Sequence, residues 1–182
     1  MIQLLSDTCS VIKLLAPGLD LFRPGLLTVG DLVVHPLLHQ EVKKWCKEKK
    51  QRLKVEIDRI KAMRAPPGIR LDKLALDAQC AIIRLVEVHL DLDIGHKDRE
   101  YLATVLCNDQ MELVTNDVAS LGAVAKELDV NIRCAEEILV IAHREGVVSK
   151  KLMNATISHW LAIREIPSRK GRAILAMAGF RI

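Results

Sequence analysis

The sequence predicts an α/β fold built on a short central parallel sheet of four to five strands, with helices on both faces. Four short apolar runs have the length of buried strands, and each precedes a segment in which apolar residues recur at helical spacing. The 182 residues are 50% hydrophobic and only 3% aromatic, so the core is aliphatic. Strands that alternate with helices are typical of parallel βαβ units, and the length fits one domain over residues 1–182.

The N-terminal half predicts two strand–helix units. Apolar runs at residues 1–5 and 31–34 are too short for helices, and helical spacing follows each of them. Proline suits the first turn of a helix, so Pro36 marks the start of the second helix. We expect this helix to continue as one long element to Arg64, because the prolines within residues 65–68 must end it.

The rest of the chain predicts two further strands among many helices. Apolar runs at residues 111–115 and 130–133 are the strand candidates, and the closing run at residues 180–182 is a candidate edge strand. The expected helices lie at residues 71–89, from residue 95 onward, through 121–128, and at 135–145, 150–164 and 168–178.

Positive charge is concentrated in one segment. The chain has a net charge of +4, and between Lys43 and Arg64 ten cationic residues stand against three anionic ones. We call residues 43–64 the basic segment. It would attract a polyanion, although a solvated helix face gives the same pattern. The scarcity of aromatic rings argues against single-strand binders of the RRM or OB kind, which stack bases on such rings.

The cysteine pattern and the N-terminus bear on the compartment. Five cysteines stand singly without a C-x-x-C pair, so we expect small buried side chains in a reducing environment. Asp7 and Lys13 interrupt the N-terminal apolar stretch, which therefore does not resemble a signal peptide. No apolar run approaches the length of a membrane span. These observations predict a cytoplasmic protein.

Four acidic residues are candidates for one site. Asp7 and Asp117 each follow an apolar strand, and ligands of open parallel sheets collect at the carboxyl ends of the strands. Both positions also suit a helix N-cap. Glu41, one turn into a helix, and Asp98, in the first turn of another, can flank the same edge. Crowded carboxylates repel unless a cation neutralises them, and hard oxygen ligands suit Mg²⁺ or Mn²⁺.

Around these residues the sequence resembles the PIN-domain ribonucleases. The resemblance rests on the segments 4–12, 39–42, 97–103 and 113–117, and the tail segments 142–148 and 178–182 are similar to one subgroup of the family. It implies a PIN-like three-layer fold and hydrolysis of RNA phosphodiester bonds with Mg²⁺ or Mn²⁺. Position by position, Asp7, Glu41, Asp98 and Asp117 match the acidic quartet of the family, and Thr115 and Asn116 match its polar flank.

The resemblance also implies roles for these residues. Asp7 and Asp117 would ligate the metal directly, Glu41 and Asp98 would complete its shell, and Thr115 or Asn116 would orient a water or a phosphate. Glu100 competes with Asp98 for the third acidic position, but Asp98 fits better because Tyr101 then falls on the core side. Beyond Glu41, the candidate contacts to the RNA backbone are Lys43, Lys44 and Lys47.

Other interpretations stay open. The segment from about residue 43 to 75 is longer and more basic than in small VapC-like toxins, which leaves open a role in a toxin–antitoxin pair. The acids would only cap helices in a non-catalytic module that uses the basic segment to hold nucleic acid or an acidic protein. The same segment would alternatively pack on an antitoxin-like partner or on a second copy in a homodimer. A zinc site at His35 and His39 is not expected, because the H-E-x-x-H pattern is absent.

Overall fold

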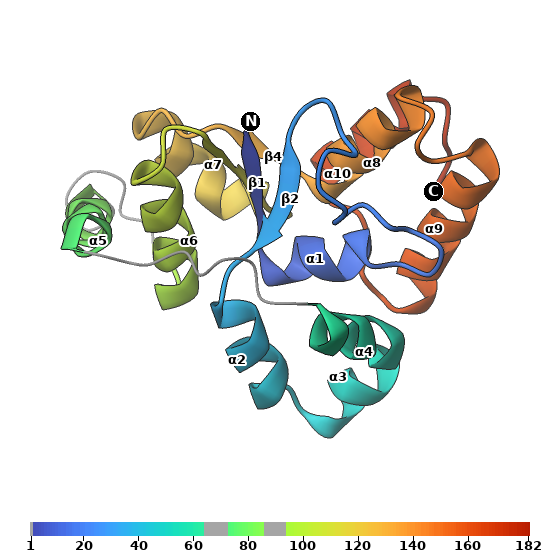
Figure 1. Cartoon of the computed structure of the whole chain (residues 1–182), viewed down its shortest axis with the longest axis horizontal. Coiled ribbons are helices and arrows are strands. Elements are labelled where there is room, and N and C mark those ends of the chain that lie inside the picture. Colours follow the sequence, from blue (N-terminus) through green and yellow to red (C-terminus); the bar gives the residue numbers. More distant parts are fainter. Residues whose placement is uncertain (1, 64–72, 86–93) are drawn as a thin grey trace.

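The computed structural model describes residues 2–63, 73–85 and 94–182. Within them the predicted α/β class is confirmed, since an all-parallel sheet of four strands has helices on both sides (Figure 1). All four apolar runs form strands, and the first and third become neighbours. The strands are β1 (Gln3–Ser6), β2 (Asp31–Val34), β3 (Met111–Val114) and β4 (Ile132–Arg133), in the order β2-β1-β3-β4.

The prediction of an additional edge strand at residues 180–182 is wrong, because these residues form no strand. Phe180 is buried, and its ring meets the His143 ring edge-on with 5.2 Å between the ring centroids. The aromatic side chain therefore anchors the tail as an irregular segment on the helical layer.

The helices follow the predicted order. Those after residue 94 closely match the expected ranges, whereas the ends of the helix expected at 71–89, and the proline break at 65–68, lie outside the described residues. The helices are α1 (Thr8–Leu14), α2 (Leu37–Lys44), α3 (Lys47–Arg52), α4 (Lys54–Ala62), α5 (Lys73–Leu85), α6 (His96–Leu106), α7 (Val118–Glu127), α8 (Ala135–Arg144), α9 (Lys150–Ala162) and α10 (Arg169–Met177).

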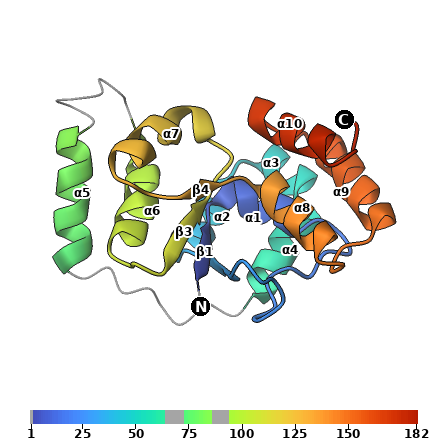
Figure 2. The same ribbon diagram turned by 90° about the horizontal axis from the view of Figure 1, so that it is seen from above.

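Successive side chains of β1 belong to two hydrophobic clusters on opposite faces of the sheet. Leu4 packs in a cluster with Leu139 of α8 and Trp160 of α9, whereas Leu5 packs with Leu102 of α6 and Leu121 of α7. Successive strand residues point to opposite faces, so both faces are covered. Figure 2 shows α5, α6 and α7 on one side of the strands and α1, α8, α9 and α10 on the other.

The expected single helix over the basic segment is wrong, because the chain forms three helices there. Trp45 and Cys46 have extended backbone between α2 and α3, and Leu53 separates α3 from α4. Leu53 and Ile57 are buried in a third hydrophobic cluster with Val42 of α2. A straight helix could not bring both ends of this segment to one cluster. In Figure 1, α2, α3 and α4 lie beyond the carboxyl ends of the strands.

Arg59 fixes this helical group to the C-terminal end of α1. Its guanidinium donates to the carbonyl oxygens of Leu15 and Ala16, both at 2.7 Å, and to that of Leu19. Carbonyl groups at a helix end have no partner within the helix. This cation of the basic segment therefore has a structural function.

Two expectations about composition have different outcomes. Among the described residues no helix has the length and apolar character needed to cross a bilayer. The expectation of buried cysteines is wrong for most of them: Cys134 is buried, but Cys9, Cys46 and Cys80 are exposed.

Candidate active site

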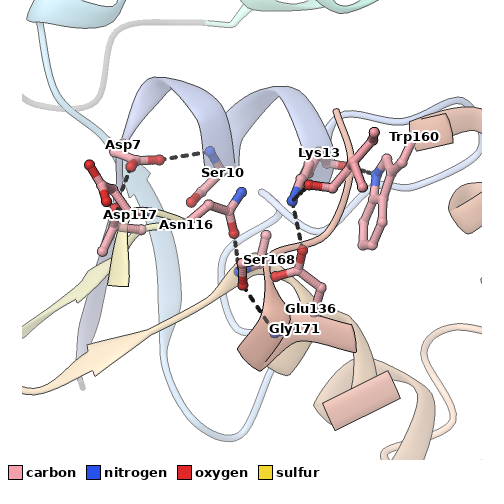
Figure 3. Close-up of polar contacts among 12 residues, drawn as sticks. Asp7, Ser10, Lys13, Asn116, Asp117, Glu136, Trp160, Ser168 and Gly171 are labelled. Carbon is pink, nitrogen blue, oxygen red and sulfur yellow. Dashed lines mark hydrogen bonds and ion pairs between the residues drawn. The ribbon is translucent and has the colours of Figure 1, made fainter. Parts of the chain in front are cut away.

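The pairing of β1 with β3 brings the first and last acids of the predicted quartet together. The strands are parallel with Ser6 opposite Val114, and the Asp7 amide donates to the Val114 carbonyl at 2.9 Å. Thr115 then links both acids: its hydroxyl donates to Asp7 Oδ2 at 2.6 Å and accepts from the Asp117 amide at 3.1 Å. Figure 3 shows the Asp7 and Asp117 side chains next to each other.

Asp7 caps helix α1, and its environment disfavours the ionised carboxylate. Its Oδ1 accepts from the Ser10 amide at 2.7 Å, as expected for the residue that begins α1. Burial raises the pKa of this carboxyl, hydrogen bonds from Thr115 and Ser10 partly counteract that, and the nearby Glu41 raises it further. The net effect is a raised pKa, so the ionised form is less favourable here than in water.

Helices α2 and α6 supply the remaining two acids. Glu41 forms an ion pair with Lys97 Nζ, between a largely buried carboxylate and a half-exposed lysine. Asp98 lies in the first turn of α6. Its pKa is raised to about 6 by burial and by the negative charges of Asp7, Asp117 and Glu41, while Lys97 lowers it. Asp98 therefore interacts electrostatically with the other three acids of the predicted quartet.

A pocket of about 360 Å³ opens among these elements. Asp7, Glu41 and Asp98 line it, together with Lys97 and Tyr101. The Tyr101 hydroxyl lies 3.4 Å from Thr8 Oγ1, and burial raises the pKa of the phenol. We call this the acid pocket. It joins a second pocket of about 280 Å³ between α2 and α6 through shared residues.

The predicted residues take different positions around the acid pocket. Asp117 is exposed and lies beside Asp7 rather than in the pocket lining. Glu100 binds His96 Nδ1 at 2.9 Å and lines the second pocket, so Asp98 is the better third acid. Within the described ranges, no three His, Cys, Asp or Glu side chains stand close enough together to hold a metal ion. Lys97 forms an ion pair with Glu41 and lowers the pKa of Asp98, so it partly compensates the negative charge of these carboxylates.

Thr115 and Asn116 do not line the acid pocket. Thr115 is fully buried, and its hydroxyl is engaged by Asp7 and Asp117. With its amide group rotated by 180°, the orientation that satisfies both polar atoms, Asn116 would donate to Glu136 Oε2 and accept from Lys13 Nζ, each at 3.1 Å. In Figure 3 it lies between the carboxylates and this ion pair. Both side chains thus position the turn that carries Asp117.

Sequence reasoning missed the buried ion pair that holds Asn116. Lys13 Nζ of α1 lies 2.6 Å from Glu136 Oε1 of α8, and their side chains are 2% and 0% exposed. Trp160 adds a hydrogen bond from its indole to the Lys13 carbonyl at 2.9 Å. A lysine between the apolar residues Ile12 and Leu14 was the signal in the sequence, and nothing local pointed to its distant partner.

The candidate RNA-contacting lysines are separated in space. Lys43 faces a pocket between α2, α3 and α4, whereas Lys44 lines the second pocket beside α6. Lys47 is exposed at the start of α3.

His35 is buried beside α6. Its Nδ1 accepts from the Leu37 amide at 3.1 Å, and its Nε2 lies 3.3 Å from Thr104 Oγ1. Burial lowers the pKa of this imidazole to about 4.

Comparison of the chain with family models, with curated proteins and with solved structures finds no match.

Proposed function

We propose that the chain is a PIN-like ribonuclease that hydrolyses RNA phosphodiester bonds with Mg²⁺ or Mn²⁺ at the acid pocket. The main support is the charge at Asp98, whose pKa is raised to about 6 by burial and by the three other acids of the predicted quartet. Such a concentration of negative charge is costly without a cation. A divalent cation would relieve it, and carboxylate oxygens are the ligands that Mg²⁺ and Mn²⁺ prefer.

The four carboxylates are of the chemical type that a hard divalent ion prefers, and they would have to move closer together to hold one. Asp7 and Asp117 would hold it from neighbouring strand ends, while Glu41 and Asp98 would complete its shell directly or through water. Lys97 now neutralises Glu41, and because its side chain is 46% exposed it can swing into solvent without a burial penalty. When bound, such ions lower the pKa of a water that attacks phosphorus and stabilise the leaving oxygen.

The protein residues perform the positioning. The Thr115 hydroxyl holds the Asp7 carboxylate and the Asp117 backbone amide in place. The Ser10 amide holds the second carboxylate oxygen of Asp7. Tyr101 and Lys97 border the same pocket, where each offers a donor to a phosphate oxygen. The arrangement favours backbone recognition, because phosphate contacts carry affinity and not sequence.

Cleavage and metal binding test this proposal together. Wild type should cleave a labelled RNA only with Mg²⁺ or Mn²⁺ and bind Mn²⁺ in calorimetry, whereas Asp7→Asn and Asp117→Asn should lose both properties. Asp109→Asn is the matched control, since this exposed acid precedes β3 at the opposite edge of the sheet. RNA cleavage that persists in a purified Asp7→Asn/Asp117→Asn double variant would refute the proposal.

A second candidate function is a binding module without turnover. The pocket that Lys43 shares with other lysines favours it, because a basic cavity needs no metal to hold an anion. Salt-sensitive RNA binding without cleavage under any divalent metal would select this function. The antitoxin-like partner and the homodimer stay predictions.

A further inference from the structure

The pocket between α2, α3 and α4 concentrates positive charge. It encloses about 360 Å³, and four lysines line it: Lys43, Lys50, Lys54 and Lys61. Its apolar floor includes Ile57, and Asp58 is the acid in its lining. We call it the lysine pocket. The lysines come from three short helices, so the breaks in the basic segment are what bring them together.

Few negative charges compensate the positive charge of the lysines in this pocket. Asp58 lies 3.8 Å from Lys61, and both side chains are more than 60% exposed, where an ion pair contributes little. Lys50 Nζ donates to the Lys43 carbonyl at 3.2 Å, which holds it at the pocket rim without neutralising it. Among the described residues no carboxylate pairs with Lys43, Lys50 or Lys54.

Other cations of the basic segment have structural partners instead. Arg59 binds carbonyl groups at the end of α1, and Arg52 lies 3.6 Å from a Glu165 oxygen. Lys49 stacks over the Trp45 ring at 4.4 Å from its centroid. The segment therefore divides into cations that hold the fold and lysines that converge on a cavity. A solvated helix face would not bring lysines of three helices to one cavity.

Helix α2 separates the lysine pocket from the acid pocket. Its Glu41 lines the acid pocket, and its Lys43 lines the lysine pocket. A helix with its side chains is about 10 Å across. A nucleic-acid strand that crosses α2 can therefore reach both pockets, and Lys44 lies in the pocket that adjoins the acid pocket.

We propose that the lysine pocket binds a backbone phosphate of the nucleic-acid strand, about one helix diameter from the acid pocket. This inference rests on the proposed function in taking RNA as the ligand, and it adds a binding site for the strand outside the cleavage site. The ligand chemistry is a phosphodiester, so DNA can supply it as well as RNA. Recognition requires positive charge and space, both of which the pocket provides.

Binding in the absence of metal tests the pocket independently of cleavage. The whole chain is titrated into a short fluorescent oligoribonucleotide in EDTA, and anisotropy is measured at several salt concentrations. Lys50→Glu/Lys54→Glu should weaken binding roughly tenfold or more at low salt. The slope of log K against log salt concentration should become shallower by about 1.4, the value expected for two lost phosphate contacts to a single strand. The matched control is Lys150→Glu/Lys151→Glu, two exposed lysines at the start of α9, which should bind within about twofold of wild type.

Folding and ligand class are controlled in the same experiment. Thermal unfolding is recorded for each variant, and Lys50→Gln/Lys54→Gln provides a milder change that should still reduce the salt slope. A DNA oligonucleotide of the same sequence should bind comparably, because the contact is to phosphate. Competition by polyglutamate as strong as that by RNA would instead assign the pocket to an acidic protein and overturn the proposal.

The outcomes separate the two proposals. Asp109→Asn should bind RNA in EDTA as wild type does, because this exposed acid lines neither the lysine pocket nor the acid pocket. Loss of binding in the lysine variants, with no cleavage by wild type under any metal, supports the lysine pocket and removes the ribonuclease. Unchanged binding in the lysine variants overturns the lysine pocket even where wild type cleaves RNA. Failure of wild type to bind RNA at low salt overturns it as well.

Discussion

Two groups of charged side chains lie on either side of Asn116, and they differ in balance. On one side Lys13 and Glu136 form a fully buried ion pair of equal and opposite charge. On the other side the acid pocket and Asp117 gather four carboxylates, with Lys97 as a nearby cation. The balanced group is satisfied within the fold, whereas the unbalanced group faces an opening. Excess charge that the fold itself leaves uncompensated marks the place where a ligand can be stabilised.

The first prediction breaks the balanced group. Lys13→Met leaves the Glu136 carboxylate buried without its partner, and Glu136→Gln does the same to the Lys13 ammonium. Each should lower the free energy of unfolding by about 3–5 kcal/mol, measured by urea denaturation. The double change Lys13→Met/Glu136→Met should lose less than the sum of the single changes, because no unpaired charge remains.

The control for this experiment is an exposed ion pair. Asp58→Asn removes the partner of Lys61 at the surface, and a loss of under about 1 kcal/mol is expected. Equal losses for the buried and the exposed pair would contradict the structural role assigned to Lys13 and Glu136.

The second prediction crowds the balanced group. A Cβ on Gly171 of α10 would lie 2.5 Å from the Glu136 carboxyl carbon, and the ion pair leaves that group no room to move. Gly171→Ala should therefore cost about 3 kcal/mol, at the upper end of the range for overpacking. Gly122→Ala in α7 is the matched change, since its Cβ would meet nothing closer than 3.7 Å. It should raise the thermal midpoint slightly, because alanine favours the helix.

The third prediction changes how the two acids at the strand ends are held. Thr115→Val removes the donor to Asp7 Oδ2 and the acceptor of the Asp117 amide in one step. We expect a loss of about 1–2 kcal/mol in chemical denaturation, together with weaker Mn²⁺ binding in calorimetry. Thr115→Ser keeps the hydroxyl and should keep the Mn²⁺ affinity. Unchanged Mn²⁺ affinity in Thr115→Val would show that the hydroxyl is not needed to hold the two acids in their binding positions.

The fourth prediction concerns pH and the unbalanced group. The folded pKa of Asp98, about 6, lies above its ordinary value of 3.8. Between these values the folded chain retains a proton that the unfolded chain releases, so the free energy of unfolding falls as pH rises through this window. After allowance for solvent screening the effect is about 1 kcal/mol.

The comparison with Asp98→Asn isolates this carboxyl. In EDTA, the variant should gain stability relative to wild type between pH 4 and pH 7, whereas Asp109→Asn should show a smaller change. Adding Mn²⁺ to wild type at pH 7 should recover the lost stability, because the ion would compensate the same charge. A wild type that is stabilised relative to Asp98→Asn as pH rises would contradict the direction of the shift.

The strands were predictable because four short apolar runs carry their own signal. Asp7 could be placed as a cap and as an acid at a strand end, since both follow from its position after the first run. The adjacency of the first and third strands, which brings Asp117 to Asp7, depends on strand order and was a condition of the prediction rather than a result.

Other features depend on tertiary packing, which local patterns do not encode. No proline or glycine marks the break at Trp45 and Cys46, and the chain turns there because Leu53 and Ile57 reach the cluster that contains Val42. The terminal run failed as a strand because burial of Phe180 against His143 replaced strand pairing. Lys13 and Glu136 meet across a long sequence separation, for which a single sequence carries no signal.

The attachment of Arg59 to the end of α1 has a mechanical consequence. Asp7 caps one end of this short helix, and the Arg59 guanidinium occupies the carbonyls at the other. Helix α1 therefore links α4, which lines part of the lysine pocket, to Asp7 of the acid pocket. Under the function proposed above, an RNA strand bound at the lysine pocket would keep its scissile bond in a fixed place, and loss of the Arg59 hydrogen bonds would uncouple binding from cleavage.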